Sequence, residues 1–245
     1  MSAKRVLFLG GNGHCEARLD PARASLKARG SDLELVDAHY PGFEGRARAS
    51  SLDAFLDSIA ERFERERPDT VYATGIGGLF LLALRARDQL RVPAILQGAV
   101  LWGLEHRTFA RVMRGPLPHL LRLALRTPLA RWRFEKRHLA GVEAVDKRAF
   151  FRGYAECAAF PDFFRWLRAP LLRSLEATFA EAPERLDDLR AWWGARDHVV
   201  GLEELRVTES ALGRSIPCTT YDAWGHYPML EDPDGWSEEL LRAVA

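Results

Sequence analysis

The sequence has few cysteines and no long apolar run. Its three cysteines, Cys15, Cys157 and Cys218, are odd in number, far apart and without a CxxC pair. This spacing argues against a disulfide framework and against a cysteine-type zinc site. No apolar stretch approaches the ~18 residues that a membrane-spanning helix needs. We therefore expect a reduced, cytoplasmic protein.

An excess of charge of one sign is also missing, because the formal net charge is +1. Such a balance provides no global attraction to nucleic acid or to an anionic membrane, so neither is expected as a partner. With 245 residues, 47% of them hydrophobic, the chain can bury one sizeable core and carry one inserted subdomain. Formation of a homodimer is left open.

Residues 70–87, TVYATGIGGLFLLALRAR, organise the rest of the sequence. They read as a short apolar strand, a glycine-rich turn and a strongly apolar helix. Small residues at Ala73, Gly77 and Gly78 allow backbone and helix to pack closely around the turn. The spacing is that of the G-x-S-x-G elbow, in which a strained turn lifts a serine above a sheet. Here the apex of the turn is Gly75.

Strands and helices alternate on both sides of this stretch. Apolar patterns predict strands at residues 5–9, 32–38, 93–100, 189–193 and 218–224, and helices at residues 21–29, 51–67, 202–212 and from 235 onward. This alternation is typical of right-handed βαβ crossovers and a parallel sheet. From residue 105 to about 170 the pattern is helical only. We expect an α/β core of residues 1–103 and 171–245, with a helical cap at 104–170.

Several landmarks together resemble the α/β-hydrolase family with a helical cap. They are LGGNG at 9–13, DAHYPGFEGRA at 37–47, ATGIGG at 73–78, WWGARDHVV at 192–200 and WGHYPMLEDP at 224–233. Each is weak alone, but they follow the order of the family over residues 6–233. The resemblance implies the α/β-hydrolase fold, a mainly parallel sheet of about six strands with the cap inserted after the fourth strand.

The resemblance also assigns roles in a candidate active site. Asp197 matches the acid and His226 the base of a catalytic triad, in which the acid orients the imidazole. The backbone amides of Asn12 and Ile76 match the oxyanion hole. Other interpretations stay open: Asp197 could satisfy N–H groups at a helix start, and His226 could be an ordinary loop residue.

Gly75 is the departure from the family pattern, because the nucleophilic serine is missing there. Glycine adopts the strained elbow conformation freely, so it can keep the turn while removing the nucleophile. Thr74 is the nearest hydroxyl, but shifting the motif to it would place the bulky Tyr72 where the elbow needs a small residue. An engineered replacement of serine is also open.

The glycine loop is followed directly by two residues, His14 and Cys15, that could contribute to the reaction. A thiolate at Cys15 beside His226 would be a competent nucleophile, although free cysteines are more often small buried hydrophobes. His14 could line the same pocket or be a loop residue. His119 and His138 lack partners at metal-ligand spacing, and G-G-N-G lacks dinucleotide spacing. We therefore expect no metal and no other cofactor.

The predicted cap is rich in arginine between residues 107 and 137. It could bind anions, or form an amphipathic lid with solvated arginines, and the near-zero net charge favours the lid.

The leading hypothesis is a hydrolase-like enzyme that acts on a small, largely apolar ester or carbonyl substrate through Asp197 and His226. The alternative is a catalytically silent ligand-binding or scaffold protein. A third hypothesis is a membrane-surface protein, although membrane contact is not expected.

Overall fold

The computed structural model describes residues 3–99, 101–103, 117–139 and 142–245. Within these ranges, six strands form one sheet in the order β2-β1-β3-β4-β5-β6, and all neighbouring pairs are parallel. The strands are β1 (Arg5–Leu9), β2 (Glu34–Asp37), β3 (Thr70–Thr74), β4 (Ala94–Gln97), β5 (Leu189–Gly194) and β6 (Cys218–Tyr221). The prediction of a parallel sheet of about six strands is confirmed.

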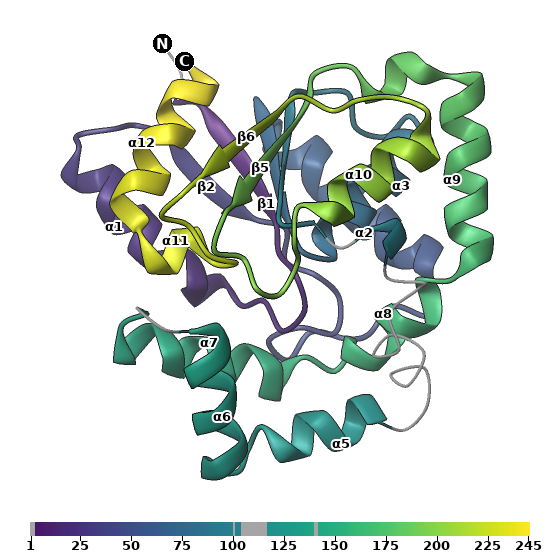
Figure 1. Cartoon of the computed structure of the whole chain (residues 1–245). Helices are drawn as coiled ribbons and strands as arrows, with labels where there is room; N and C mark the ends of the chain where they lie inside the picture. Colours follow the sequence, from purple (N-terminus) through teal and green to yellow (C-terminus); the bar gives the residue numbers. More distant parts are fainter. Residues whose placement is uncertain (1–2, 100, 104–116, 140–141) are drawn as a thin grey trace.

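Helices cover both faces of the sheet (Figure 1). On one face, α1 packs against α11 and α12, and on the other α3 packs against α2 and α9, with α10 beside α9. The bounds are α1 (Asp20–Ala28), α2 (Leu52–Glu66), α3 (Gly77–Ala86), α9 (Ala169–Glu181), α10 (Glu203–Leu212), α11 (Pro228–Glu231) and α12 (Pro233–Val244), with 3-10 turns η1 (Glu16–Leu19) and η3 (Pro183–Leu186). The start of the described chain lies beside its C-terminal residue, since Lys4 Nζ donates to the carbonyl of Ala245 at 2.7 Å.

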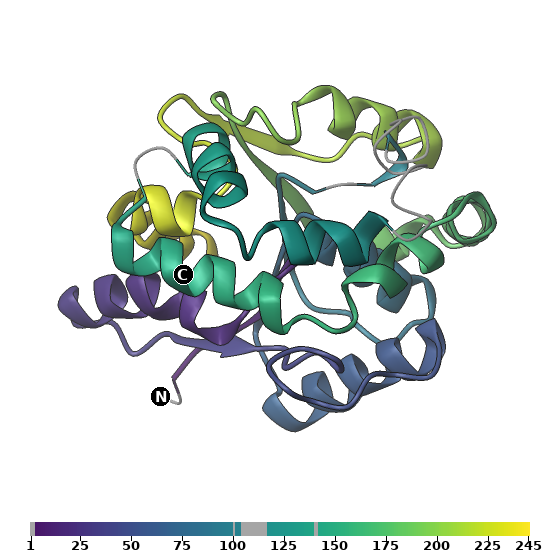
Figure 2. The ribbon, with the colours of Figure 1, turned by 90° about the horizontal axis from the view of Figure 1, so that it is seen from below.

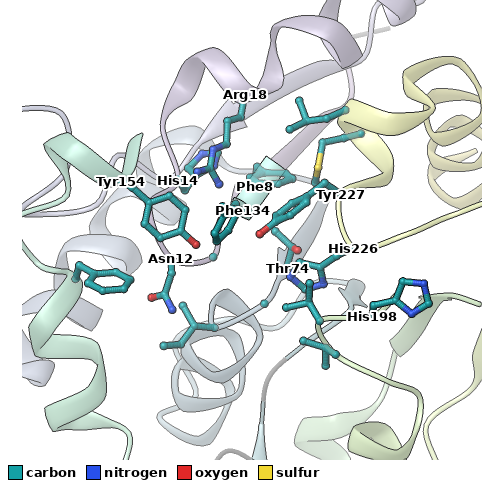
Figure 3. Close-up of a pocket in the computed structure, with 18 of the residues that line it drawn as sticks. Phe8, Asn12, His14, Arg18, Thr74, Phe134, Tyr154, His198, His226 and Tyr227 are labelled. Carbon is teal, nitrogen blue, oxygen red and sulfur yellow. The ribbon is translucent and has the colours of Figure 1, made fainter. Parts of the chain in front are cut away.

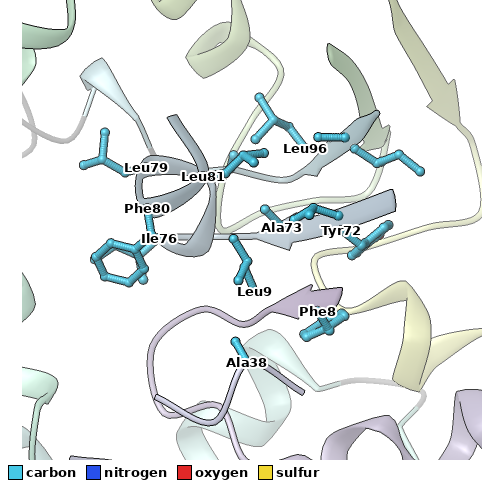
Figure 4. Packing of buried hydrophobic residues seen from close by; sticks show 14 of the residues in the cluster. Phe8, Leu9, Ala38, Tyr72, Ala73, Ile76, Leu79, Phe80, Leu81 and Leu96 are labelled. Atoms are coloured by element: carbon cyan, nitrogen blue, oxygen red, sulfur yellow. The ribbon is translucent and has the colours of Figure 1, made fainter. Parts of the chain in front are cut away.

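The strand β3 lies in the centre of the sheet and all five of its residues are buried. Its apolar side chains pack with those of β1, β4 and α3, among them Leu9, Ala73 and Leu81 (Figure 4). The helix α3 starts directly against β1, since a Cβ at Gly77 would lie 2.2 Å from the carbonyl oxygen of Leu9. The small residue predicted at this position is therefore required by close approach of the two backbones.

Of the helices that the structure describes between β4 and β5, those that precede α9 cross the carboxyl ends of the strands (Figure 2). They are α5 (Leu117–Ala124), α6 (Pro128–His138), α7 (Ala144–Glu156) and α8 (Phe160–Trp166), called the helical insertion below. Contacts of Phe163 with Phe55 and Phe80, at ring distances of 5.5 and 5.1 Å, join α8 to the core. The start of the predicted cap, with Arg107, Arg111 and Arg114, lies outside the described residues. Its boundaries remain a prediction.

Candidate active site

A cavity of about 560 Å³ lies between the helical insertion and the carboxyl ends of the strands (Figure 3). Apolar and aromatic side chains make up most of its wall, as is usual for small-molecule sites. The lining residues are Phe8, Gly11, Asn12, His14, Arg18, Thr74, Gly75, Ile76, Leu121, Phe134, Tyr154, Phe160, Phe164, His198, Val199, Val200, His226, Tyr227, Met229 and Leu230. The loops after β1, β3, β5 and β6 therefore all reach one chamber.

Asp197 and His226 meet at the edge of this cavity. His226 Nδ1 lies 2.8 Å from Asp197 Oδ2, and both residues are buried. The other carboxylate oxygen, Oδ1, accepts from the amides of Val199 and Val200, both at 2.8 Å. These amides belong to the loop before α10, so Asp197 holds its own loop with one oxygen and the imidazole with the other.

The loop that carries His226 is held from several sides. Glu231 accepts from the amides of both neighbours, Gly225 at 2.7 Å and Tyr227 at 3.1 Å. Gln97, at the end of β4, donates from Nε2 to the carbonyl of His226 at 3.3 Å. Burial raises the pKa of Glu231, although the two amide donors oppose this shift. The backbone of His226 is thus fixed independently of its side-chain bond.

Gly98 allows the pair to pack against the end of β4. Its φ is +49°, a conformation that favours glycine. A Cβ at this position would lie 2.9 Å from Asp197 Oδ2 and 3.1 Å from His226 Nδ1. The prediction that β4 extends to residue 100 is therefore wrong, because the left-handed backbone at Gly98 ends the strand at Gln97.

Gly75 occupies the apex of the turn after β3 with a φ of +56°. A Cβ there would meet one atom within 4 Å, the Cα of Gly11 at 3.5 Å, which is an ordinary contact. Since Gly75 also lines the cavity, a side chain at this position would extend into it. The neighbouring hydroxyl of Thr74 donates to Gln97 Oε1 at 3.0 Å and is already engaged.

The glycine loop after β1 lies directly against this turn. A Cβ at Gly11 would lie 3.8 Å from the amide nitrogen of Ile76. Asn12 and Ile76 both line the cavity, and within the described part of the chain neither amide N–H donates to a protein acceptor. Two amides are thus available next to Gly75, and their role as an oxyanion hole remains a prediction.

The structure separates the two other candidate residues. Cys15 is buried outside the cavity lining, with its Sγ 3.2 Å from the carbonyl oxygen of Ala149, and burial raises the pKa of its thiol. A buried thiol of raised pKa outside the cavity does not suit the predicted nucleophile. His14, by contrast, lines the cavity and is hydrogen-bonded through Nε2 to the buried Asp37.

Sequence reasoning missed Arg18, Tyr154 and His198, which line the cavity, and Asp37, which holds the lining residue His14. A signal existed for Asp37, since it ends β2 beside β1, and the carboxyl ends of adjacent parallel strands lie at one edge. No comparable signal exists for Tyr154, because its position depends on how α7 folds back over the sheet.

Within the described ranges, no group of three or more His, Cys, Asp or Glu residues could hold a metal ion, and no helix is long and apolar enough to span a bilayer.

Comparison with known proteins identifies the fold. No protein-family profile and no curated protein matches the chain. Among solved structures, a hydrolase from Pseudomonas aeruginosa PA01 aligns with a TM-score of 0.69 at 15% identity, over 99% of this chain and 90% of that one. An extracellular α/β-hydrolase from a Paenibacillus species aligns with a TM-score of 0.67 at 13% identity, over 98% of each chain. A carboxylesterase structure from Nitrososphaera gargenis gives 0.63 at 13% identity, over 98% and 89%. The chain has the α/β-hydrolase fold.

Proposed function

We propose that this chain, which has the α/β-hydrolase fold, is an enzyme that hydrolyses a small, largely apolar ester or related carbonyl compound. The observation that carries the proposal is the 2.8 Å bond between His226 Nδ1 and Asp197 Oδ2 at the wall of an apolar cavity. A buried carboxylate at Nδ1 fixes the imidazole tautomer with its proton on that atom. The other ring nitrogen, Nε2, is then a free base.

In the proposed reaction, His226 Nε2 takes a proton from a water molecule as the water oxygen attacks the ester carbonyl. The carbonyl electrons move to the oxygen, and the amides of Asn12 and Ile76 stabilise the negative charge. When the intermediate collapses, the bond to the alcohol oxygen breaks and His226 returns the proton to that oxygen. Asp197 stabilises the imidazolium between the two transfers. Because no hydroxyl stands at Gly75, no acyl-enzyme forms there.

The test is a panel of 4-nitrophenyl esters with short and medium acyl chains, assayed with the wild-type protein and His226→Ala. General base catalysis contributes about 10²–10⁴-fold, so the variant is expected to lose that much of kcat/KM. His119→Ala is the matched control, since His119 is exposed on α5 and does not line the cavity. Equal turnover by His226→Ala and wild type would remove the base from the proposal.

Gly75 itself favours a second function, the binding of an apolar ligand without turnover. Glycine gives the turn its left-handed backbone without strain, and the cavity is retained although the nucleophile is absent. If no ester is hydrolysed, equilibrium binding of the same esters to the wild-type protein and to His226→Ala would support this alternative. A ligand-binding protein is expected to bind equally well in both forms.

Exposed apolar side chains favour a third function, contact with a membrane surface. Leu120, Leu123, Leu129 and Trp132 on α5 and α6 are 54–74% exposed. Arginines of α6 lie among them, and anionic lipid attracts such basic segments. This third function predicts salt-sensitive sedimentation with phosphatidylserine vesicles, which should be lost on changing Leu129 and Trp132 to serine. Val207→Ser is the control, because Val207 is an exposed apolar residue on α10.

A further inference from the structure

Arg18 is a buried cation in the wall of the cavity. It lies on η1, one turn after the glycine loop, and is 6% exposed. Arginine is rarely buried without a partner, because moving a charge out of water is costly unless it is paired. Figure 3 draws Arg18 and His14 on one side of the cavity, with Thr74 and His226 on the other. Its charge therefore lies in the same chamber as the proposed base.

The protein pairs only part of this guanidinium. Nη2 donates to the carbonyl of Phe150 at 3.0 Å, and the carbon Cζ lies 3.9 Å from the centre of the Phe150 ring. Within the described residues, Nε has no hydrogen-bond partner, and no carboxylate forms an ion pair with Arg18. The aromatic ring and one carbonyl hold the side chain in place, but they do not neutralise its charge.

A second polar atom in the lining is also without a partner. Asn12 Oδ1 is buried and makes no hydrogen bond to any described residue. A side-chain amide can present either its oxygen or its NH₂ group to a ligand. The cavity thus combines an apolar wall with two polar groups that the protein leaves unsatisfied, which is the arrangement expected where a ligand supplies the missing partners.

A short series of ring contacts connects the Arg18 guanidinium with the proposed reaction centre at His226. The Phe150 ring beneath Arg18 lies 5.0 Å from the ring of Tyr227, which lies 4.6 Å from the imidazole of His226. One ligand can therefore place an acidic group at Arg18 and a carbonyl near His226, with an apolar segment between them. A phosphate monoester carries about −1.5 to −2 charges, whereas a single guanidinium balances the one charge of a carboxylate.

We infer that Arg18 binds a carboxylate carried by the substrate, so that the cavity takes an apolar ester or ketone with one acidic end. This inference rests on the proposed function for the reacting end of the ligand. The acidic end is recognised by charge-assisted hydrogen bonds from the guanidinium.

The test measures equilibrium binding by calorimetry, which needs no turnover. Phenylacetate, 3-phenylpropionate and octanoate are compared with their neutral amides and with phenyl phosphate. Wild type is expected to bind at least one carboxylate tenfold more tightly than its amide, and Arg18→Met is expected to lose this preference. Arg190→Met, which removes an exposed arginine of β5, is expected to keep it. His226→Ala is also expected to keep it, so a failed esterase assay and a failed binding assay can be told apart.

Three results would overturn the inference: no preference for any carboxylate over its amide in wild type, a preference unchanged in Arg18→Met, or tighter binding of phenyl phosphate than of every carboxylate. The comparison of acid with amide in wild type remains decisive if Arg18→Met does not fold. Arg18→Lys keeps the charge but loses the planar fork, so it is expected to retain a weakened preference.

Discussion

Two buried His–Asp pairs contribute their histidines to the same cavity, on opposite sides of the central strand. His14 and Asp37 come from the ends of β1 and β2, whereas Asp197 and His226 follow β5 and β6. In the sheet order, β3 and its glycine turn separate the two pairs. The pairs have the same chemical groups and similar burial, but their different geometries lead us to predict different roles.

The difference lies in which ring nitrogen meets the carboxylate. His226 bonds through Nδ1, so its outermost nitrogen, Nε2, is left for a ligand. His14 bonds through Nε2, so the outermost nitrogen is used up and the remaining one lies nearer its own backbone. The His14 ring also packs against the loop, since a Cβ at Gly10 would lie 2.1 Å from its Cγ. A histidine held in this way ties two strand ends together, whereas one held through Nδ1 can exchange protons with a substrate.

The largest expected effect is a loss of turnover, and it should distinguish the Asp197–His226 pair from the His14–Asp37 pair. Asp197→Asn should lower the turnover of 4-nitrophenyl esters by about 10²–10⁴-fold, because the imidazole loses its fixed tautomer and the partner of its positive charge. Asp37→Asn, the same change in the other pair, should leave turnover close to wild type while lowering the melting temperature. Steady-state kinetics and thermal melting of both variants provide the check. Equal loss of turnover in both would contradict the distinction.

Much of this comparison could be predicted from the sequence, but unevenly. A parallel α/β sheet followed from the alternation of apolar patterns, and the resemblance to a family implied the α/β-hydrolase fold and pointed to Asp197 and His226. The bond between His14 and Asp37 required knowing that β1 and β2 are neighbours in the sheet. The position of Arg18 depends on Phe150, which lies 132 residues away in the chain. Pairings of this kind arise from tertiary packing and leave no local pattern.

The Asp197–His226 pair should also be sensitive to a single methyl group. Gly98→Ala would bring a Cβ to 2.9 Å from Asp197 Oδ2 and displace the pair, and a shift of about 1 Å can cost about 10²-fold in rate. Gly213→Ala is the matched control. Its φ of +61° imposes comparable backbone strain, but a Cβ there meets nothing within 4 Å. We expect both to lose stability and only Gly98→Ala to lose turnover, as measured by melting and kinetics.

The substitution Gly75→Ser tests which histidine can activate a serine placed at the elbow. Gly75→Ser should become reactive toward a fluorophosphonate probe, to which we expect the wild-type elbow to be inert, and should lose ~1–3 kcal/mol of stability because serine must hold the left-handed turn. Adding His226→Ala should abolish labelling, whereas adding His14→Ala should not. Gly213→Ser, with φ of +61°, controls for the strain and should remain unlabelled. Mass spectrometry of the labelled peptide gives the answer, and labelling that survives His226→Ala would assign activation to another group.

The smallest expected effect is the pH dependence of stability due to the His14–Asp37 pair. Burial raises the pKa of Asp37, but the His14 imidazole and the amide of His39 outweigh it, so the net pKa lies below the usual value. A carboxyl whose folded pKa is lowered stabilises the fold above its unfolded pKa of about 3.9, and this contribution is lost as pH falls through the folded value. Urea unfolding at pH 7 should show wild type more stable than Asp37→Asn by about 1.5 kcal/mol, the usual worth of a hydrogen bond to a charged group. The gap should close as the pH is lowered below about 4. A gap that stays constant down to pH 3 would mean that the ionised carboxylate of Asp37 does not hold the strand ends together.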